Sequence, residues 1–87
     1  MLEHQETSAL DEIGCNLFYY KKIHAGDDGT NLFGIYLEMK SQDKVVESAY
    51  TGPISEDEKF VRGIIAKLAA GQVTPCCLEE VVDELIA

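Results

Sequence analysis

The sequence predicts an α+β fold in which a three-stranded antiparallel meander precedes two amphipathic helices packed on one of its faces, in the order β-β-β-α-α. Three observations support this prediction. Residues 30–40 alternate apolar and other side chains with a two-residue period, residues after Pro53 place apolar side chains at helical spacing, and short turns separate the extended stretches. A sheet with one face covered by two helices is the simplest arrangement that buries these apolar surfaces.

Three strands are predicted, at residues 15–24, 30–40 and 45–51. The first is rich in aromatic and β-branched residues. The second places Phe33, Ile35, Leu37 and Met39 on one face. The connections at residues 25–29 and 41–44 contain the Gly, Asp and Ser typical of turns. Residues 1–13 show no clear period, so we expect a flexible lead-in there and a single domain over residues 14–87.

Capping residues mark both predicted helices. Ser55 and Glu58 form a capping-box pattern at the start of the first helix, and Gly71 lies where a left-handed C-terminal cap belongs. Thr74 and Pro75 suit the N-cap and first position of the second helix. The predicted buried stripes are Phe60, Val61, Ile64, Ile65 and Leu68 in the first helix, and Leu78, Val81, Val82, Leu85 and Ile86 in the second.

The composition is strongly acidic, which limits the classes of partner. Sixteen Asp and Glu stand against seven Lys and Arg, for a net charge of −9. Nucleic acids and anionic membrane surfaces both need a basic patch, so we expect neither as a partner. No signal-peptide pattern and no apolar stretch long enough for a bilayer is present, and the three cysteines do not form a disulfide framework pattern. A cytoplasmic location is therefore expected.

The C-terminal residues carry a motif made of Thr74, Pro75, Leu78, Val81, Val82, Asp83, Glu84, Leu85 and Ile86. Behind a helix opened by Ser and acidic residues, this pattern resembles small uncharacterised proteins of Firmicutes of the DUF6514-like type. The resemblance covers about the last two thirds of the chain and implies a fold rather than an activity, because its motif consists of helix-cap and core residues. Those proteins tend to have an Ile-His-like pair after the Pro. Here Cys76 and Cys77 follow it, so no role is carried over to this pair.

Phe18, Tyr20 and Tyr36 are expected on the sheet face away from the helices, with Leu32 or Val45 beside them. Because no sequence remains to form a third layer, this group predicts an interaction surface for a homodimer or another protein partner. The alternative is that the N-terminal segment folds across this face through Leu10 and Ile13.

Cys76 and Cys77 are candidate reactive thiols. In the first turn of a helix, free N–H groups and the helix dipole stabilise a thiolate. Adjacent helical residues point about 100° apart, however, so the pair is not expected to act as a C-x-x-C motif does. Zinc would need two further ligands, and Cys15, His4 and His24 have no convincing spacing. The alternative is that both cysteines are small buried hydrophobes. No metal and no cofactor is predicted.

No catalytic motif is recognised in the sequence. His24 beside Asp27 and Asp28 lacks a placed nucleophile, and the acidic residues of the last helix lack the loop of a calcium site. We therefore expect a non-enzymatic interaction or regulatory module that self-associates through the sheet face; in a variant, the acidic helix surface meets a basic protein. The alternative function is a thiol-based redox or metal-responsive protein that uses Cys76 and Cys77.

Overall fold

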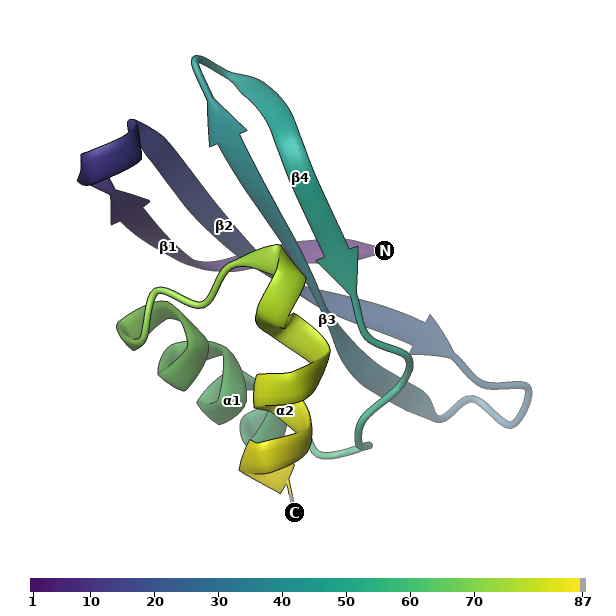
Figure 1. The fold of residues 1–87 in the computed structure, drawn as a ribbon. Helices are drawn as coiled ribbons and strands as arrows, with labels where there is room; N and C mark the ends of the chain where they lie inside the picture. Colours follow the sequence, from purple (N-terminus) through teal and green to yellow (C-terminus); the bar gives the residue numbers. More distant parts are fainter. Residues whose placement is uncertain (87) are drawn as a thin grey trace.

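The computed structural model describes residues 1–86 and confirms an α+β fold, with four strands instead of three. The elements are β1 (Leu2–Leu10), η1 (Asp11–Ile13), β2 (Cys15–Ala25), β3 (Asn31–Ser41), β4 (Lys44–Tyr50), α1 (Glu58–Ala70), η2 (Pro75–Cys77) and α2 (Leu78–Ile86), where η marks a 3₁₀ turn. Each strand pairs antiparallel with the next, in the order β1-β2-β3-β4. Both helices lie on the same face of the sheet (Figure 1).

Strand β1 corrects the prediction of a three-stranded sheet preceded by a lead-in over residues 1–13. The strand pairs with β2 from Leu2 opposite Lys22 to Leu10 opposite Cys15. It is an edge strand, and most of its side chains are exposed, so it shows little apolar alternation. Backbone pairing with its neighbour places it, and a side-chain pattern does not report such pairing.

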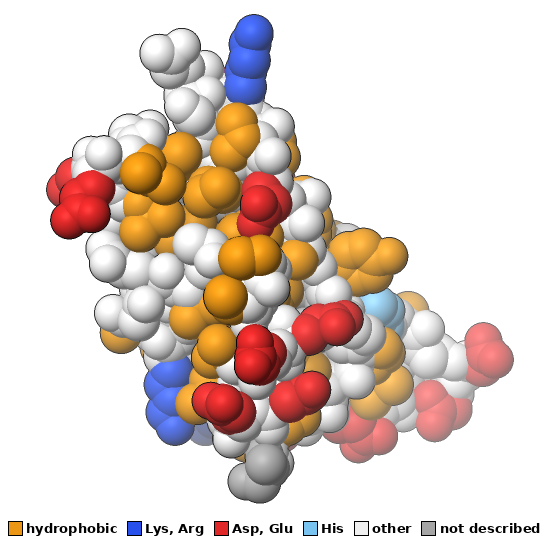
Figure 2. All heavy atoms as spheres, in the orientation of Figure 1, with side chains coloured by type: hydrophobic (Ala, Val, Ile, Leu, Met, Phe, Trp, Pro, Cys, Tyr) orange, Lys and Arg blue, Asp and Glu red, His pale blue; other side chains and the backbone are white. Residues whose placement is uncertain are grey.

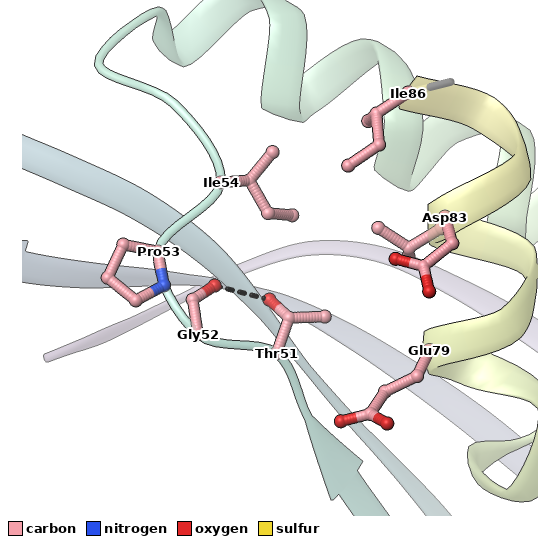
Figure 3. A pocket seen from close by; sticks show the side chains of 8 residues that line it. Thr51, Gly52, Pro53, Ile54, Glu79, Asp83 and Ile86 are labelled. Atoms are coloured by element: carbon pink, nitrogen blue, oxygen red, sulfur yellow. Dashed lines mark hydrogen bonds between the residues drawn. The ribbon is translucent and has the colours of Figure 1, made fainter.

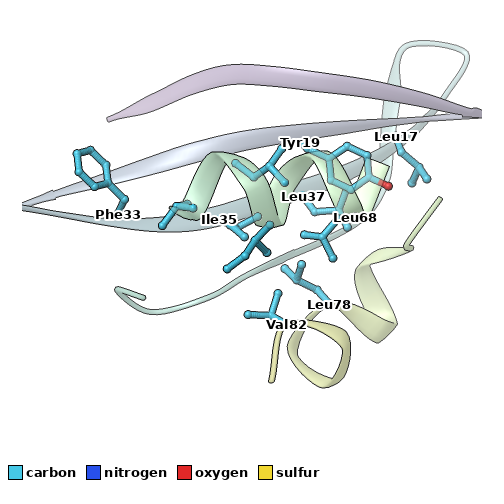
Figure 4. Packing of buried hydrophobic residues seen from close by; sticks show 11 residues of the cluster. Leu17, Tyr19, Phe33, Ile35, Leu37, Leu68, Leu78 and Val82 are labelled. Carbon is cyan, nitrogen blue, oxygen red and sulfur yellow. The ribbon is translucent and has the colours of Figure 1, made fainter. Parts of the chain in front are cut away.

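The core lies between the sheet and the two helices (Figure 4). Leu17 and Tyr19 of β2 and Ile35 and Leu37 of β3 are fully buried. They pack against helical residues of both predicted stripes: Val61, Ile64, Ile65, Leu68, Leu78 and Val82. Each large apolar side chain buried in this way contributes about 1.5–3 kcal/mol. The predicted inner face of residues 30–40 is therefore confirmed, while Phe60 and Ile86 depart from the expected stripes because each is 44% exposed.

Helix α1 begins two residues later than the capping-box pattern indicates. Asp57 is its N-cap, and one carboxylate oxygen accepts the N–H groups of Lys59 at 3.0 Å and Phe60 at 3.3 Å. Ser55 is still paired with β3, since its carbonyl accepts the N–H of Phe33 at 2.8 Å. Because the Ser55 carbonyl accepts from Phe33, it does not accept the first N–H of the helix, and the carbonyl of Asp57 accepts that of Val61 instead.

The C-terminal end of α1 also differs from the prediction. Gly71 has a φ of −88°, and the left-handed residue is Gln72, with a φ of 52°. Its side-chain amide donates a hydrogen bond of 2.7 Å to the carbonyl of Ala9 in β1. The left-handed turn therefore directs this side chain to the edge of the sheet.

Lys21 is a buried charge on the inner face of β2. Its Nζ lies 3.1 Å from a carboxylate oxygen of Glu3 in β1 and 2.9 Å from one of Glu58 in α1. Desolvation alone would lower the pKa of Lys21, but hydrogen bonds to Glu58 and Glu3 outweigh it, so the pKa is raised. The same hydrogen bond from Lys21 lowers the pKa of Glu58. Lys21 thus joins the edge strand to the first turn of α1.

Candidate interaction surface and thiol pair

The sheet face opposite the helices, called the outer face below, carries a row of aromatic rings across all four strands. His4 is paired with Tyr20, Tyr20 with Tyr36, and Tyr36 with Tyr50, and residues paired in this way share a face. Ring centroids lie 5.5 Å apart between His4 and Tyr20 and 5.8 Å apart between Tyr20 and Tyr36. Phe18 extends the row, with its ring 6.3 Å from that of His4.

Two lysines flank this row. The Nζ of Lys22 lies 4.2 Å from the centroid of Tyr50, and Lys22 reaches it across Gly34, which has no side chain. The Nζ of Lys40 lies 5.1 Å from the centroid of Phe18 and 3.3 Å from a carboxylate oxygen of Glu38. Cation–π contacts of this kind contribute about 0.5–1 kcal/mol at exposed sites. They hold the lysine side chains flat against the aromatic surface.

The charge of the outer face differs in sign from that of the whole chain. Among the acidic residues of the four strands, Glu38 is the one on this face, because Glu3, Glu6 and Glu47 are paired with inner-face residues. Lys22 and Lys40 both lie on it. The strands thus give the outer face more Lys than Asp and Glu, whereas the chain has a net charge of −9.

No further layer of residues 1–86 covers the outer face. The N-terminal segment does not fold across it as the alternative supposed: β1 lies in the plane of the sheet, Leu10 packs against the core, and Ile13 is 63% exposed. The backbone of Gly52 approaches the outer face at Gly34. A β-carbon at position 34 would lie only 2.7 Å from the carbonyl oxygen of Gly52, so glycine is required there.

The structure therefore brings the predicted Phe18, Tyr20 and Tyr36 together on the outer face. Four further members of this surface were not predicted from the sequence: His4, Tyr50, Lys22 and Lys40. His4 lies in the unrecognised strand, and the position of Tyr50 depends on the register between β3 and β4, which contains an irregularity near Met39. Lys22 and Lys40 follow from the same two-residue alternation as Tyr20 and Tyr36, whereas His4 and Tyr50 could be placed only by the pairing and register of β1 and β4.

Both edge strands of the sheet make side-chain contacts with the helical layer. At β1, the side-chain amide of Gln72 donates a hydrogen bond to the carbonyl of Ala9. The Nε of Arg62 donates to the side chain of Gln5 at 3.2 Å, where the register of β1 shifts. At β4, the carboxylate of Glu47 accepts the backbone N–H of Cys76 at 3.0 Å. A partner that added a strand at β1 would have to displace the contact at Ala9, whereas the contact at β4 involves the side chain of Glu47 and not the backbone of the strand.

Cys76 and Cys77 lie in η2, directly before α2. Their sulfur atoms are 3.7 Å apart, although the sequence analysis expected the two side chains to point in different directions. Both residues belong to a short 3₁₀ turn, in which successive side chains diverge by about 120°, so the side-chain torsions and not the turn itself bring the sulfur atoms together. The pair is accessible, since Cys76 is exposed and Cys77 is half-buried.

The thiolate of Cys77 is disfavoured by its neighbours. A hydrogen bond with Cys76 raises the pKa of the Cys77 thiol, and the charges of Cys76 and Glu80 act in the same direction. A hydrogen bond with Thr74 acts in the opposite direction but does not outweigh them. The helix start therefore does not produce the activated Cys77 thiolate that the sequence analysis considered.

A pocket of about 390 Å³ lies between residues 51–54 and α2 (Figure 3). Glu79 and Asp83 line one side, and the remaining wall is largely apolar. The hydroxyl of Thr51 is already used, because it accepts the N–H of Ile35 at 2.9 Å and donates to the carbonyl of Gly52 at 2.8 Å. Together with the exposed Glu80 and Glu84, these carboxylates form the acidic surface of α2. Figure 2 shows acidic side chains gathered over α2, beside hydrophobic ones.

The His–Asp pair considered for general-base chemistry is not assembled within the described residues. The carboxylate of Asp28 accepts the backbone N–H of Thr30 at 3.0 Å, which lowers the pKa of Asp28. The Nε2 of His24 is enclosed without a hydrogen-bond partner in residues 1–86.

A four-stranded antiparallel sheet, backed by two helices on one face and open on the other, defines a small α+β domain with an aromatic outer face. The chain belongs to DUF6514, a family of unknown function, whose sequence model matches residues 1–87. Neither a search of curated proteins nor a search of solved structures returns a match. In the part of the chain that the structure describes, no helix is both long and apolar enough to span a bilayer.

Proposed function

We propose that this protein is a non-enzymatic, cytoplasmic interaction or regulatory module that self-associates through its outer face. The observation that carries the proposal is the aromatic row His4–Tyr20–Tyr36–Tyr50, which crosses the whole sheet and is not covered by another layer of residues 1–86. Aromatic side chains are enriched at protein interfaces because they bury a large area at a low cost in conformational entropy.

The size of the outer face fits a second copy of the chain. Four strands of 7–11 residues, spaced about 4.8 Å apart and rising about 3.4 Å per residue, give a flat footprint of roughly 500 Å². Specific interfaces bury about 800 Å² per partner, and most lattice contacts bury less than about 400 Å² per partner. The outer face lies between these values, which favours a weak, concentration-dependent dimer.

Charge also favours association through this face. Two chains of charge −9 repel each other wherever their acidic surfaces meet, and the acidic face of α2 is one such surface. The outer face carries Lys22 and Lys40 together with Glu38, so two copies related by a twofold axis offer both signs of charge to each other. In a second form of this proposal, the acidic surface of α2, which the dimer leaves free, binds a basic protein.

The proposal is tested by the solution mass of wild-type protein and of a Tyr36→Glu variant over a wide concentration range. Tyr36 lies on β3, in the middle of the row, so the substitution would remove a central ring and bury a charge in the dimer at a cost in free energy. We expect the wild-type mass to rise from one 9.6 kDa chain towards two, and the variant to remain a monomer.

Ile13→Glu is the matched control, because it adds the same charge at an exposed apolar residue away from the outer face. It should associate as the wild type does. Far-ultraviolet circular dichroism verifies that both variants are folded. A wild-type chain that stays at 9.6 kDa at every concentration, or a Tyr36→Glu variant that dimerises normally, would show that the proposal is wrong.

A second candidate function is the thiol-based redox or metal-responsive protein, and one observation favours it. The two sulfur atoms of Cys76 and Cys77 lie 3.7 Å apart on an accessible turn, which removes the geometric objection raised by their adjacency in sequence. Alkylation and metal-binding measurements test this candidate independently of the oligomeric state.

A further inference from the structure

The turn that carries Cys76 and Cys77 is fixed from several directions. Pro75 is buried, and the N–H of Cys77 donates to the carbonyl of Thr74 at 3.0 Å. The N–H of Cys76 donates to Glu47 of β4 at 3.0 Å, and the hydroxyl of Thr74 lies 3.3 Å from the sulfur of Cys76. These contacts fix the backbone that carries both sulfur atoms, which lie 3.7 Å apart, so a ligand that binds both would meet a pair that needs little rearrangement.

The separation of the sulfur atoms matches that of two ligands on one tetrahedral cation. At a zinc–sulfur bond length of about 2.3 Å and tetrahedral angles, two thiolates on the same ion lie roughly 3.8 Å apart. The observed separation is 3.7 Å. A disulfide would require the sulfur atoms to approach to about 2.05 Å, which demands a rearrangement of the turn. The present geometry therefore suits a shared cation better than a bond between the two sulfurs.

The surroundings of the pair favour a cation. The carboxylate of Glu47 lies beside the turn, and Glu79 and Glu80 follow in the first turn of α2. Their negative charge attracts a divalent ion from solution. Thiolate ligands select soft ions such as Zn²⁺ over hard ions such as Ca²⁺ and Mg²⁺, which prefer oxygen.

We propose that Cys76 and Cys77 form a two-thiolate half-site for one soft divalent cation of the zinc class. Each thiol releases its proton to solvent as its sulfur binds the ion, so the reaction needs no oxidant. Among residues 1–86, no group of three or more His, Cys, Asp and Glu converges as a metal centre does. The pair therefore supplies two coordination positions, and water or a donor from outside the chain takes the other two. This inference deepens the second candidate function and does not depend on self-association.

The test uses the reduced, full-length chain titrated with Cd²⁺, whose bonds to thiolates give a charge-transfer absorption in the ultraviolet, and with Zn²⁺ in competition with a chromogenic chelator. We expect one cation per chain. Cys76→Ser and Cys77→Ser should each weaken binding by at least the roughly 10–100-fold that the loss of an outer-shell partner causes, because each removes a direct ligand.

The third cysteine supplies a matched control. Cys15 is buried in β2, where its Sγ lies 3.7 Å from the carbonyl oxygen of Ile13, so Cys15→Ser should bind Cd²⁺ as the wild type does. A second measurement needs no substitution: bound Zn²⁺ should protect Cys76 and Cys77 from alkylation, read by peptide mapping of the wild type.

Three results would overturn the proposal. These are a wild-type chain without the charge-transfer band, single variants that bind as tightly as the wild type, and alkylation of both cysteines at an unchanged rate with Zn²⁺. Failure of these measurements leaves the dimerisation experiment unaffected, so the two proposals can be judged separately.

Discussion

At the scale of single residues, Lys21 is the clearest example of a side chain whose role depends on its surroundings. It follows Leu17 and Tyr19 on the inner face of β2, where an apolar residue would be expected. Its aliphatic stem lies in the core region, and its Nζ meets Glu3 and Glu58 at the boundary with solvent. Both carboxylates are partly exposed, so the arrangement avoids the full penalty of a buried ion pair.

We predict that Lys21→Met destabilises the protein by about 1–2 kcal/mol, because the stem is kept while two charged hydrogen bonds are lost. The effect depends on pH. The pKa of Glu58 is lower in the folded protein than its usual 4.5, so its contribution is fully present above that value and is lost as the pH falls through the folded-state pKa. The measurement is the free energy of unfolding in urea at several pH values.

The wild type should lose more stability than Lys21→Met as the pH falls below 4.5, since Lys21 is the main cause of the lowered Glu58 pKa. Lys59→Met removes an exposed lysine from the start of α1 and serves as the control. Parallel pH profiles for the wild type and Lys21→Met would contradict this explanation.

At the scale of elements, the start of α1 shows how a neighbouring strand changes a local signal. The capping-box pattern is present in the sequence, but Ser55 remains bonded to Phe33 of β3. Asp57 therefore caps the helix, and the hydroxyl of Ser55 accepts the N–H of Asp57 at 3.0 Å instead. The strand-like pairing takes precedence over the capping motif because it satisfies backbone groups that would otherwise be unpaired.

Asp57→Ala should consequently lower the free energy of unfolding by about 1 kcal/mol, since N-cap substitutions cost about 0.5–2 kcal/mol. Ser55→Ala should cost less, because it removes one local hydrogen bond before the helix rather than the cap itself. Thermal and urea unfolding of both variants measure the difference. If Ser55→Ala lowered the free energy of unfolding more than Asp57→Ala, Ser55 would be the N-cap, as the capping-box pattern predicted.

At the scale of the whole molecule, Tyr19 joins the sheet to the helical layer. The ring is fully buried in the core, and its hydroxyl donates a hydrogen bond of 2.8 Å to the carbonyl of Val73, between the two helices. Burial raises the pKa of Tyr19 to about 12. The contact fixes the connection that leads to η2, and so it helps to position the thiol pair.

We predict that Tyr19→Phe lowers the free energy of unfolding by about 1 kcal/mol near neutral pH, through the lost hydrogen bond. Between pH 10 and 12 the wild type should lose about 2 kcal/mol, because Tyr19 ionises near 10.0 when unfolded but near 12 when folded. The variant lacks this loss, so its deficit of about 1 kcal/mol should disappear over that interval, and the variant should be the more stable protein by about 1 kcal/mol near pH 12.

Urea unfolding of the two proteins at matched pH values checks this prediction. Tyr50→Phe removes an exposed hydroxyl and is the control for neutral-pH stability. A constant difference between the wild type and Tyr19→Phe from pH 7 to pH 12 would contradict the assignment.

The sequence by itself determined the elements whose side chains report their own geometry. The period of two residues in a strand appears in Phe33, Ile35, Leu37 and Met39, and the spacing of a helix turn appears in the two helical stripes. In both cases most of the apolar side chains that follow the period pack in or against the core. The grouping of Phe18, Tyr20 and Tyr36 follows from the same alternation. These features depend on neighbours a few residues away, which a single sequence contains.

The tertiary structure alone decided the features that depend on distant residues. Backbone hydrogen bonds to β2 made an edge strand of Leu2–Leu10, and the register of β4 added Tyr50 to the aromatic row. A hydrogen bond to Glu47 holds the turn η2, on which the sulfur atoms of Cys76 and Cys77 lie 3.7 Å apart. Strand pairing and register join residues far apart in the chain, and one chain's local periodicity carries no information about such pairs.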